Sequence, residues 1–146
     1  METGTVSEQV MQQYKMMVDS AIQVTTWRHS ANNYFLSVNA ALLSIATYLY
    51  NFSSETGIII GLIGFVTTAL WYETIQYYRS LNKAKFSVIH EMEKQLPMAM
   101  FRLEEEHFVK EDRKKATSIE SNIPFIFGIA YVLIVAVHVL KIVKII

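Results

Sequence analysis

Residues 30–72 read SANNYFLSVNAALLSIATYLYNFSSETGIIIGLIGFVTTALWY, and Glu55 is the only charged residue among them. Two apolar runs, Ser30–Ser54 and Thr56–Tyr72, lie on either side of Glu55, and a third, Ser121–Leu140, follows near the C-terminus. A helix needs about 20 apolar residues to cross a bilayer core about 30 Å thick. The three runs therefore predict an integral membrane protein.

The composition agrees with a membrane location and argues against several classes of protein. Hydrophobic residues make up 52% of the chain, which is high for a soluble protein. The formal net charge of zero argues against a nucleic-acid partner. The absence of cysteine excludes disulfides and thiolate metal sites. Because the sequence also has no phosphate-binding glycine loop, GxSxG elbow or HExxH motif, we expect no enzyme and no cofactor.

The distribution of basic residues predicts the orientation in the membrane. The connection Asn51–Thr56 has none, whereas Glu73–Glu120 contains most of the Lys and Arg. The positive-inside rule places the segments flanking the first two runs in the cytoplasm and the turn between them outside. The third run then carries the C-terminus to the periplasm. Lys141 and Lys144 speak against this, so an interfacial last helix is the alternative.

The sequence therefore predicts an all-α chain with three transmembrane helices. No strong helix breaker separates a first helix, at 7–29, from the first span, at 31–52, and Pro97 ends the helix predicted at 76–96. The segments are an amphipathic cytoplasmic helix at 7–29, spans at 31–52, 57–75 and 122–142, a cytoplasmic helix at 76–96, and a charged cytoplasmic segment at 97–120.

Both predicted cytoplasmic helices carry an apolar stripe. Because the first two spans are antiparallel, these helices emerge side by side, and we expect their stripes to pack together as a membrane-proximal stalk. The alternative, helices lying flat on the bilayer, normally requires a basic polar face. The stripes are Val10, Tyr14, Met17, Ala21 and Val24 on the first helix and Tyr78, Leu81, Val88, Met92 and Leu96, alongside Phe86 and Ile89, on the second.

Small and polar residues mark the faces of the first two spans. Gly57, Gly61 and Gly64 are spaced for close approach of another helix, although the pattern does not name the partner. On the first span, we interpret three residues as candidates for lining a pore or for hydrogen bonding between helices: Ser37, Asn39 and Ser44.

Other polar and aromatic residues have more ordinary interpretations. Glu104-x-x-His107 matches one of the two Glu-x-x-His motifs that a di-iron bundle needs. We prefer a solvated helix face as its interpretation, and no metal site is predicted. His138 is interpreted as interfacial, with a functional intramembrane group as the alternative. Interfacial aromatic belts are expected at Tyr48, Tyr50 and Phe52 and at Trp71, Tyr72, Tyr77 and Tyr78. The alternative for some of these residues is an ordinary contact between helices.

Four blocks of sequence resemble the RipA family of small octameric bacterial inner-membrane proteins. Leu-Asn-x-x-Lys-Phe-x-Val-Ile and Glu-x-x-Leu-Pro within the third block are the most specific part of the likeness. The chain departs from the family pattern around Met98–Lys110. The blocks are YKMMV at 14–18, WRHSANNYFLSVN at 27–39, LWY at 70–72 with YRSLNKAKFSVIHEMEKQLP at 78–97, and SIESNIPF at 118–125.

The resemblance implies a helical homo-oligomer, an octamer, in the bacterial cytoplasmic membrane and in contact with its lipid. It implies no particular chemistry. We expect a ring that acts as a pore-like or membrane-perturbing assembly. The alternative is a non-conducting scaffold that recruits a cytoplasmic protein through its charged residues 79–120. Candidate partner-binding residues are Lys110, Arg113, Lys114 and Lys115.

Overall fold

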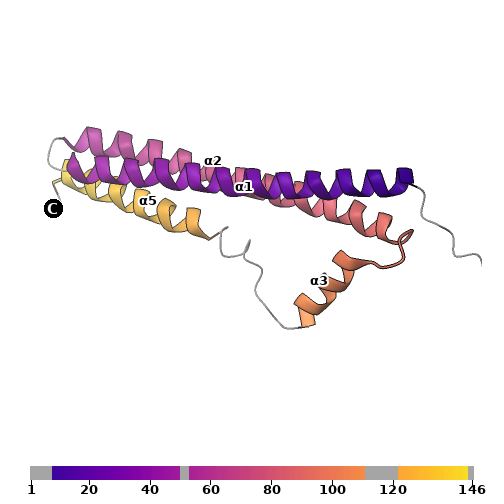
Figure 1. The fold of residues 1–146 in the computed structure, drawn as a ribbon. Coiled ribbons are helices and arrows are strands. Elements are labelled where there is room, and N and C mark those ends of the chain that lie inside the picture. The colour runs from indigo at the N-terminus through magenta and orange to yellow at the C-terminus, as the bar shows by residue number, and fades with distance from the viewer. Residues whose placement is uncertain (1–7, 50–52, 111–121, 145–146) are drawn as a thin grey trace, which may run out of the picture. The chain divides into compact units, whose positions relative to one another are not determined.

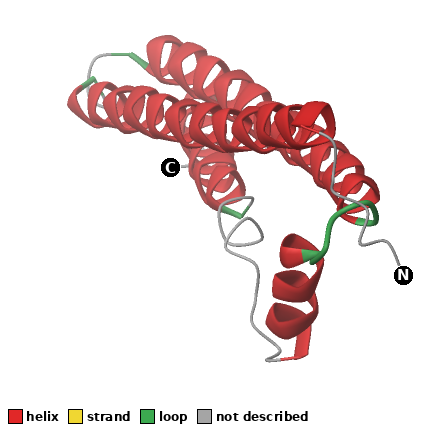
Figure 2. Cartoon of the chain, turned by 45° about the vertical axis from the view of Figure 1, so that its right-hand side comes forward, coloured by secondary structure: helices red, strands yellow, loops and turns green. Residues whose placement is uncertain are grey.

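The computed structural model describes residues 8–49, 53–110 and 122–144, and four helices account for most of them. Figures 1 and 2 show these helices, and the described ranges contain no strand. The predicted all-α class is confirmed. The helices are α1 (Glu8–Tyr48), α2 (Ser54–Glu93), α3 (Met100–Lys110) and α5 (Ile123–Ile142).

Helices α1 and α2 each merge two of the predicted segments. Helix α1 runs for 41 residues and α2 for 40. No proline or glycine occurs between Glu8 and Tyr48, and α2 contains no proline, so the strongest helix breaker is missing from both helices. The predicted boundaries at residue 30 and residue 75 are therefore points inside continuous helices.

Side chains and tight turns stabilise the ends of α2. The Ser53 hydroxyl accepts a hydrogen bond from the Thr56 amide at 3.1 Å, which satisfies one of the free N–H groups at the start of a helix. At the other end, the Lys94, Gln95 and Leu96 amides donate to carbonyl oxygens three residues earlier. Pro97 follows, as the sequence predicts for this end.

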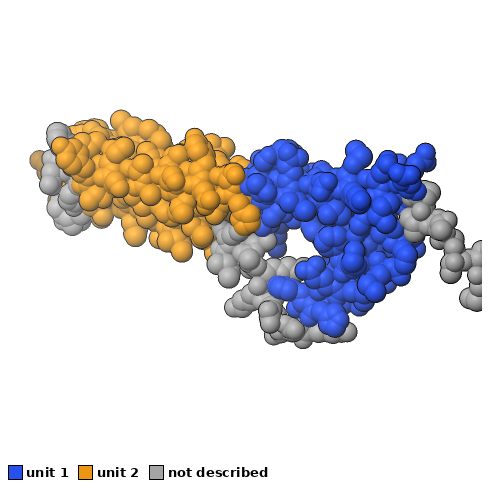
Figure 3. Space-filling view, viewed as in Figure 1, with its two compact units in different colours: residues 1–28, 77–115 blue, residues 29–76, 116–146 orange. Residues whose placement is uncertain are grey.

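The chain divides into two compact units, which Figure 3 distinguishes by colour. Unit 1 comprises Met1–Arg28 and Tyr77–Lys115, and unit 2 comprises His29–Gln76 and Ala116–Ile146. Helices α1 and α2 contribute to both units, α3 belongs to unit 1, and α5 belongs to unit 2.

The core of unit 1 is formed by the two predicted apolar stripes. Tyr14, Ala21 and Ile89 are its buried residues, so α1 and α2 pack together here as the spacing predicts. Val88 is the exception because it is 43% exposed. The partly buried residues around this core are Met17, Val18, Phe86, Met92, Leu96 and Phe101.

Unit 2 consists of the second half of α1, the first half of α2, and α5. Hydrogen bonds join Asn39 to Thr68 and Asn32 to Trp71. Residue numbers thus fall on α1 as they rise on α2, so these two helices are antiparallel. The glycines of α2 meet α5 in the same reversed order. Helix α5 is therefore also antiparallel to α2.

The glycine face of α2 packs on α5. Gly57 lies against the ring of His138, Gly61 against Val135, and Gly64 against the ring of Tyr131. Small residues allow such close approach between helices in a membrane. The sequence left the partner of this face open, and the structure assigns it to α5 of the same chain.

Helices α2 and α5 are the two described helices that are long and apolar enough to cross a membrane. Length and composition thus support two of the three predicted spans, the one in α2 and the one in α5.

Substitution of Gly64 by alanine should destabilise the packing of α5. A Cβ added at Gly64 would fall within the Tyr131 ring, whereas one added at Gly128 would lie 3.6 Å from the Thr68 methyl group, an ordinary contact. We expect Gly64→Ala to lower the free energy of unfolding by about 1–3 kcal/mol, the usual cost of overpacking. Thermal unfolding of the purified protein measures this, and Gly128→Ala is the matched control. Equal stability of the two variants would contradict the packing.

Candidate functional site

Asn39 is the polar centre of unit 2. Its side chain is fully buried. Its Oδ1 accepts a hydrogen bond from the Thr68 hydroxyl at 3.1 Å, and its Nδ2 donates to the Phe35 carbonyl at 2.8 Å. Its own backbone carbonyl accepts a bond from the Tyr131 hydroxyl at 3.1 Å. We call Asn39, Thr68 and Tyr131 the Asn39 junction, because it joins α1, α2 and α5.

Asn39 was considered for lining a pore or for hydrogen bonding between helices, and in the structure it makes a hydrogen bond between α1 and α2. Ser37 and Ser44 behave differently because both are exposed on α1. The three candidates therefore lie on two faces of α1, with Asn39 turned towards α2 and α5 and the two serines turned away from them.

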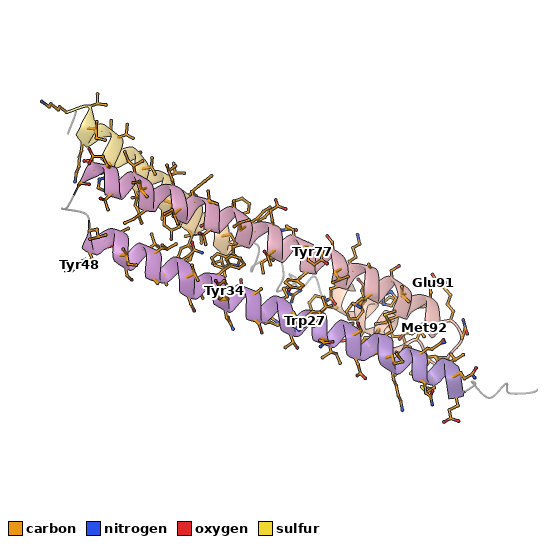
Figure 4. The ribbon with its side chains drawn as sticks, turned by 90° about the horizontal axis from the view of Figure 1, so that it is seen from above. Trp27, Tyr34, Tyr48, Tyr77, Glu91 and Met92 are labelled. Atoms are coloured by element: carbon orange, nitrogen blue, oxygen red, sulfur yellow. The ribbon has the colours of Figure 1, made fainter. Side chains whose placement is uncertain are left out.

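Trp71 extends the internal contacts next to the Asn39 junction. Its indole N–H donates to Asn32 Oδ1 at 3.1 Å. Its ring is fully buried and stacks on Phe35, with 6.3 Å between centroids and 10° between planes. Trp71 therefore makes ordinary contacts between helices, the alternative to a place in an aromatic belt. Tyr34 and Tyr48 on α1 are 64% and 78% exposed (Figure 4), so Tyr48 remains available for a belt.

His138 is 1% exposed and lies against Gly57, so its side chain is packed between α5 and α2. The physical reason is that the missing side chain of Gly57 makes room for the imidazole ring. This pairing was not visible in the sequence because the partner of the glycine face was unknown.

The outward-facing residues of unit 2 differ in part between helices. Helix α1 exposes large side chains at Tyr34, Leu36, Ile45 and Tyr48, but it also exposes a row of small and polar residues. On α1, five exposed residues of small or polar type recur at steps of four and three: Asn33, Ser37, Ala40, Ser44 and Thr47. We call this the small-residue stripe. Leu36 and Ile45 flank it. The exposed residues of α2 and α5, by contrast, are mainly large and apolar, and include Ile59, Leu62, Phe65, Leu70, Ile126, Ile129 and Leu133.

The hydroxyl groups of the small-residue stripe bond to their own helix. Ser37, Ser44 and Thr47 each donate to the carbonyl four residues earlier, at 2.9 Å in every case. This local bond lets a hydroxyl lie on the surface of a helix without a partner on another helix.

Glu93 is the polar centre of unit 1 and was not singled out from the sequence. Its carboxylate is 2% exposed and accepts hydrogen bonds from the Phe101 amide at 2.7 Å and the Arg102 amide at 3.1 Å. A carboxylate in this position satisfies free N–H groups in the first turn of a helix. Glu93 therefore holds α3 against the end of α2. The signal that could have revealed it is the Glu-x-x-Leu-Pro motif, whose glutamate is Glu93.

Tyr14 adds a third donor to Glu93. Its hydroxyl donates to Glu93 Oε1 at 3.3 Å. Burial of the phenol, followed by the charge of Glu93 and the hydrogen bond to it, raises the pKa of Tyr14 above its ordinary value. The neutral phenol is thus favoured, so Tyr14 acts as a hydrogen-bond donor.

The remaining candidates lie within α3 or beyond its end. Lys110 is its last residue, and Arg113, Lys114 and Lys115 lie outside the described residues. Glu104 and His107 are exposed on α3. Across residues 8–49, 53–110 and 122–144, no three His, Cys, Asp or Glu side chains are grouped so that they could hold a metal.

These features define an all-helical membrane protein whose subunit is built around two apolar helices. A model of the octameric membrane protein family, 8xMP, matches residues 11–140. The chain belongs to this family, and the resemblance seen in the sequence is confirmed. The name of the family describes an octamer, which implies self-association. No curated protein and no solved structure matches the chain.

Removal of the Asn39 side chain should weaken the contact between α1 and α2. Interhelical hydrogen bonds in membranes contribute on average about 0.6 kcal/mol and at most about 1.7 kcal/mol, so we expect Asn39→Ala to lower the free energy of unfolding by about 1 kcal/mol. A double-mutant cycle with Thr68→Val isolates the coupling. Asn33→Ala, at an exposed position of the same helix, should have little effect. A coupling energy of zero would contradict the bond.

Removal of the Glu93 carboxylate should release the first turn of α3. Hydrogen bonds to a charged group contribute about 1.5–3 kcal/mol, so Glu93→Ala should speed hydrogen exchange at the Phe101 and Arg102 amides by about tenfold to a hundredfold. The control is Glu91→Ala, because Glu91 is exposed near the end of α2 (Figure 4) and pairs with exposed Lys94 at 2.6 Å. Equal exchange in the two variants would show that Glu93 does not hold α3.

Proposed function

We propose that this chain forms an octameric ring in the bacterial cytoplasmic membrane and acts as a pore-like or membrane-perturbing assembly. In this proposal each subunit crosses the membrane three times, and the small-residue stripe of α1 faces a central path. The observation that carries the proposal is the contrast between this stripe and the large apolar residues exposed on α2 and α5.

The two kinds of exposed surface suit different surroundings, lipid for large apolar residues and a polar path for the small-residue stripe. Large apolar side chains are stable against lipid hydrocarbon, whereas an exposed amide such as that of Asn33 is costly there. In a closed ring every subunit presents the same face to the axis. Turning α1 inward therefore places the polar groups of eight subunits around one path and leaves α2 and α5 towards lipid.

Three lines of support favour three spans. The parts of α1 and α2 that lie in unit 2, and all of α5, each have about 20 residues, and such a helix extends about 30 Å, the thickness of the bilayer core. The antiparallel order of α1, α2 and α5 suits alternating crossings. The Ser, Thr and Asn residues that make α1 less apolar than its neighbours are those expected on a helix beside water.

The orientation follows from the basic residues. The positive-inside rule favours a cytoplasmic N-terminus and a periplasmic C-terminus. Unit 1 is then a cytoplasmic helical stalk. We propose no catalytic role, since the polar centres at Asn39 and Glu93 are occupied by contacts within the chain.

The second candidate function is a non-conducting scaffold. Helix α3 supports it, because this helix exposes apolar Met100, Leu103 and Val109 beside the acidic residues Glu104–Glu106. A surface of this kind suits a cytoplasmic protein partner, with the basic residues after α3 as further contacts.

Cysteine substitution tests the central path. Because the chain has no cysteine, a single thiol at Ser37 or Ser44 is the only reactive one. Thiolates react in water and hardly at all in hydrocarbon. We expect a small charged thiol reagent to label Ser37→Cys and Ser44→Cys in liposomes, and to reduce leakage of an entrapped dye. The control is Ile63→Cys, which replaces a residue exposed on α2.

Two outcomes would contradict the path. One is equal labelling at position 37, position 44 and position 63. The other is a confirmed octamer in liposomes that stay tight under every condition, a result that favours the scaffold.

A further inference from the structure

An open groove of about 400 Å³ lies between α2 and α5 within unit 2. Glycine at position 128 and alanine at position 69 leave it hollow, while large side chains form its walls. The lining includes Phe65, Ala69 and Tyr72 of α2 and Phe125, Gly128 and Val132 of α5.

The groove presents carbon alone, although a threonine lines it. The Thr68 hydroxyl lies 3.1 Å from Asn39 Oδ1 and 2.8 Å from the Gly64 carbonyl, so its one proton is directed at acceptors inside the unit and away from the groove. Its methyl group lies 3.6 Å from where a Cβ at Gly128 would be. The lining can therefore bind an apolar group and offers nothing to water, an ion or a polar segment.

The extent of the groove matches one leaflet of a bilayer. Along α5 it reaches from Pro124 to Leu133, which is about 14 Å at 1.5 Å per residue. This is close to half of a bilayer core about 30 Å thick. The groove begins beside exposed Asn122 and Glu73, two polar residues suited to the level of the lipid headgroups.

The surface around the groove also points to lipid. Both of its walls are the helices long and apolar enough to cross a membrane. Exposed Phe65, Ile129 and Leu133 continue the apolar surface at its edges.

We infer that this groove binds one acyl chain of a membrane phospholipid, with the headgroup at the end of the groove near Asn122. The inference does not depend on a central path, because a non-conducting octamer would bind the chain equally well.

A phospholipid with a photoreactive diazirine in its acyl chain tests the site. The intact protein is reconstituted in phosphatidylcholine and phosphatidylglycerol vesicles that contain this lipid, irradiated and mapped by mass spectrometry. We expect Tyr72 and Phe125 to be labelled more than Leu62 and Ile63, which are exposed on α2 outside the groove. Ala69→Phe should fill the groove and lower the labelling of Tyr72 and Phe125 to the level of Leu62 and Ile63.

The matched control is Ala136→Phe, because Ala136 is exposed on α5 and does not line the groove. It should leave the labelling unchanged. If Ala69→Phe does not assemble, the labelling of Tyr72 and Phe125 relative to Leu62 and Ile63 in the unaltered protein still tests whether the groove binds an acyl chain. Uniform labelling of exposed residues would overturn the site. So would a disulfide between two subunits through Phe125→Cys, since a second copy would then cover the groove.

Discussion

The close approach of α5 to the glycine face of α2 is the contact on which unit 2 depends. The ring of Tyr131 occupies the space beside Gly64, and its hydroxyl then reaches the Asn39 carbonyl at 3.1 Å. If the two helices were separated by a side chain at position 64, that hydroxyl could not reach α1. One missing side chain thus allows both the apolar packing of α2 on α5 and the polar contact of α5 with α1.

Unit 1 achieves its order by a different means. Its helices α1 and α2 pair through apolar side chains around Tyr14 and Ile89, and α3 is held through a buried carboxylate as well as through the packing of Phe101. The charge of Glu93 is compensated by three donors from two other helices, so it need not be neutralised by a basic residue. The two units therefore combine apolar helix pairing with one polar residue that joins a third helix.

Much of the fold could be predicted because it follows from periodicity and composition. The apolar stripes around Tyr14 and Ile89 and the end of α2 near Pro97 are local patterns, and the structure has them where they were expected. The contacts of His138, Trp71 and Glu93 could not be predicted from local sequence patterns. Each depends on a residue far along the chain: Gly57, Asn32 and Phe101 respectively. Spacing within one helix reveals which face is special but not which helix meets it. For the same reason, Ser37 and Asn39 could be chosen as polar residues of one span but not assigned to opposite surfaces.

The internal hydrogen bonds of the small-residue stripe also determine what α1 offers to its surroundings. Ser37, Ser44 and Thr47 each direct the hydroxyl proton at a carbonyl of their own helix. What remains outward is the oxygen lone pairs, which accept hydrogen bonds and carry partial negative charge. These three hydroxyl groups thus add hydrogen-bond acceptors, without any formal charge, to the face of α1 turned away from α2 and α5.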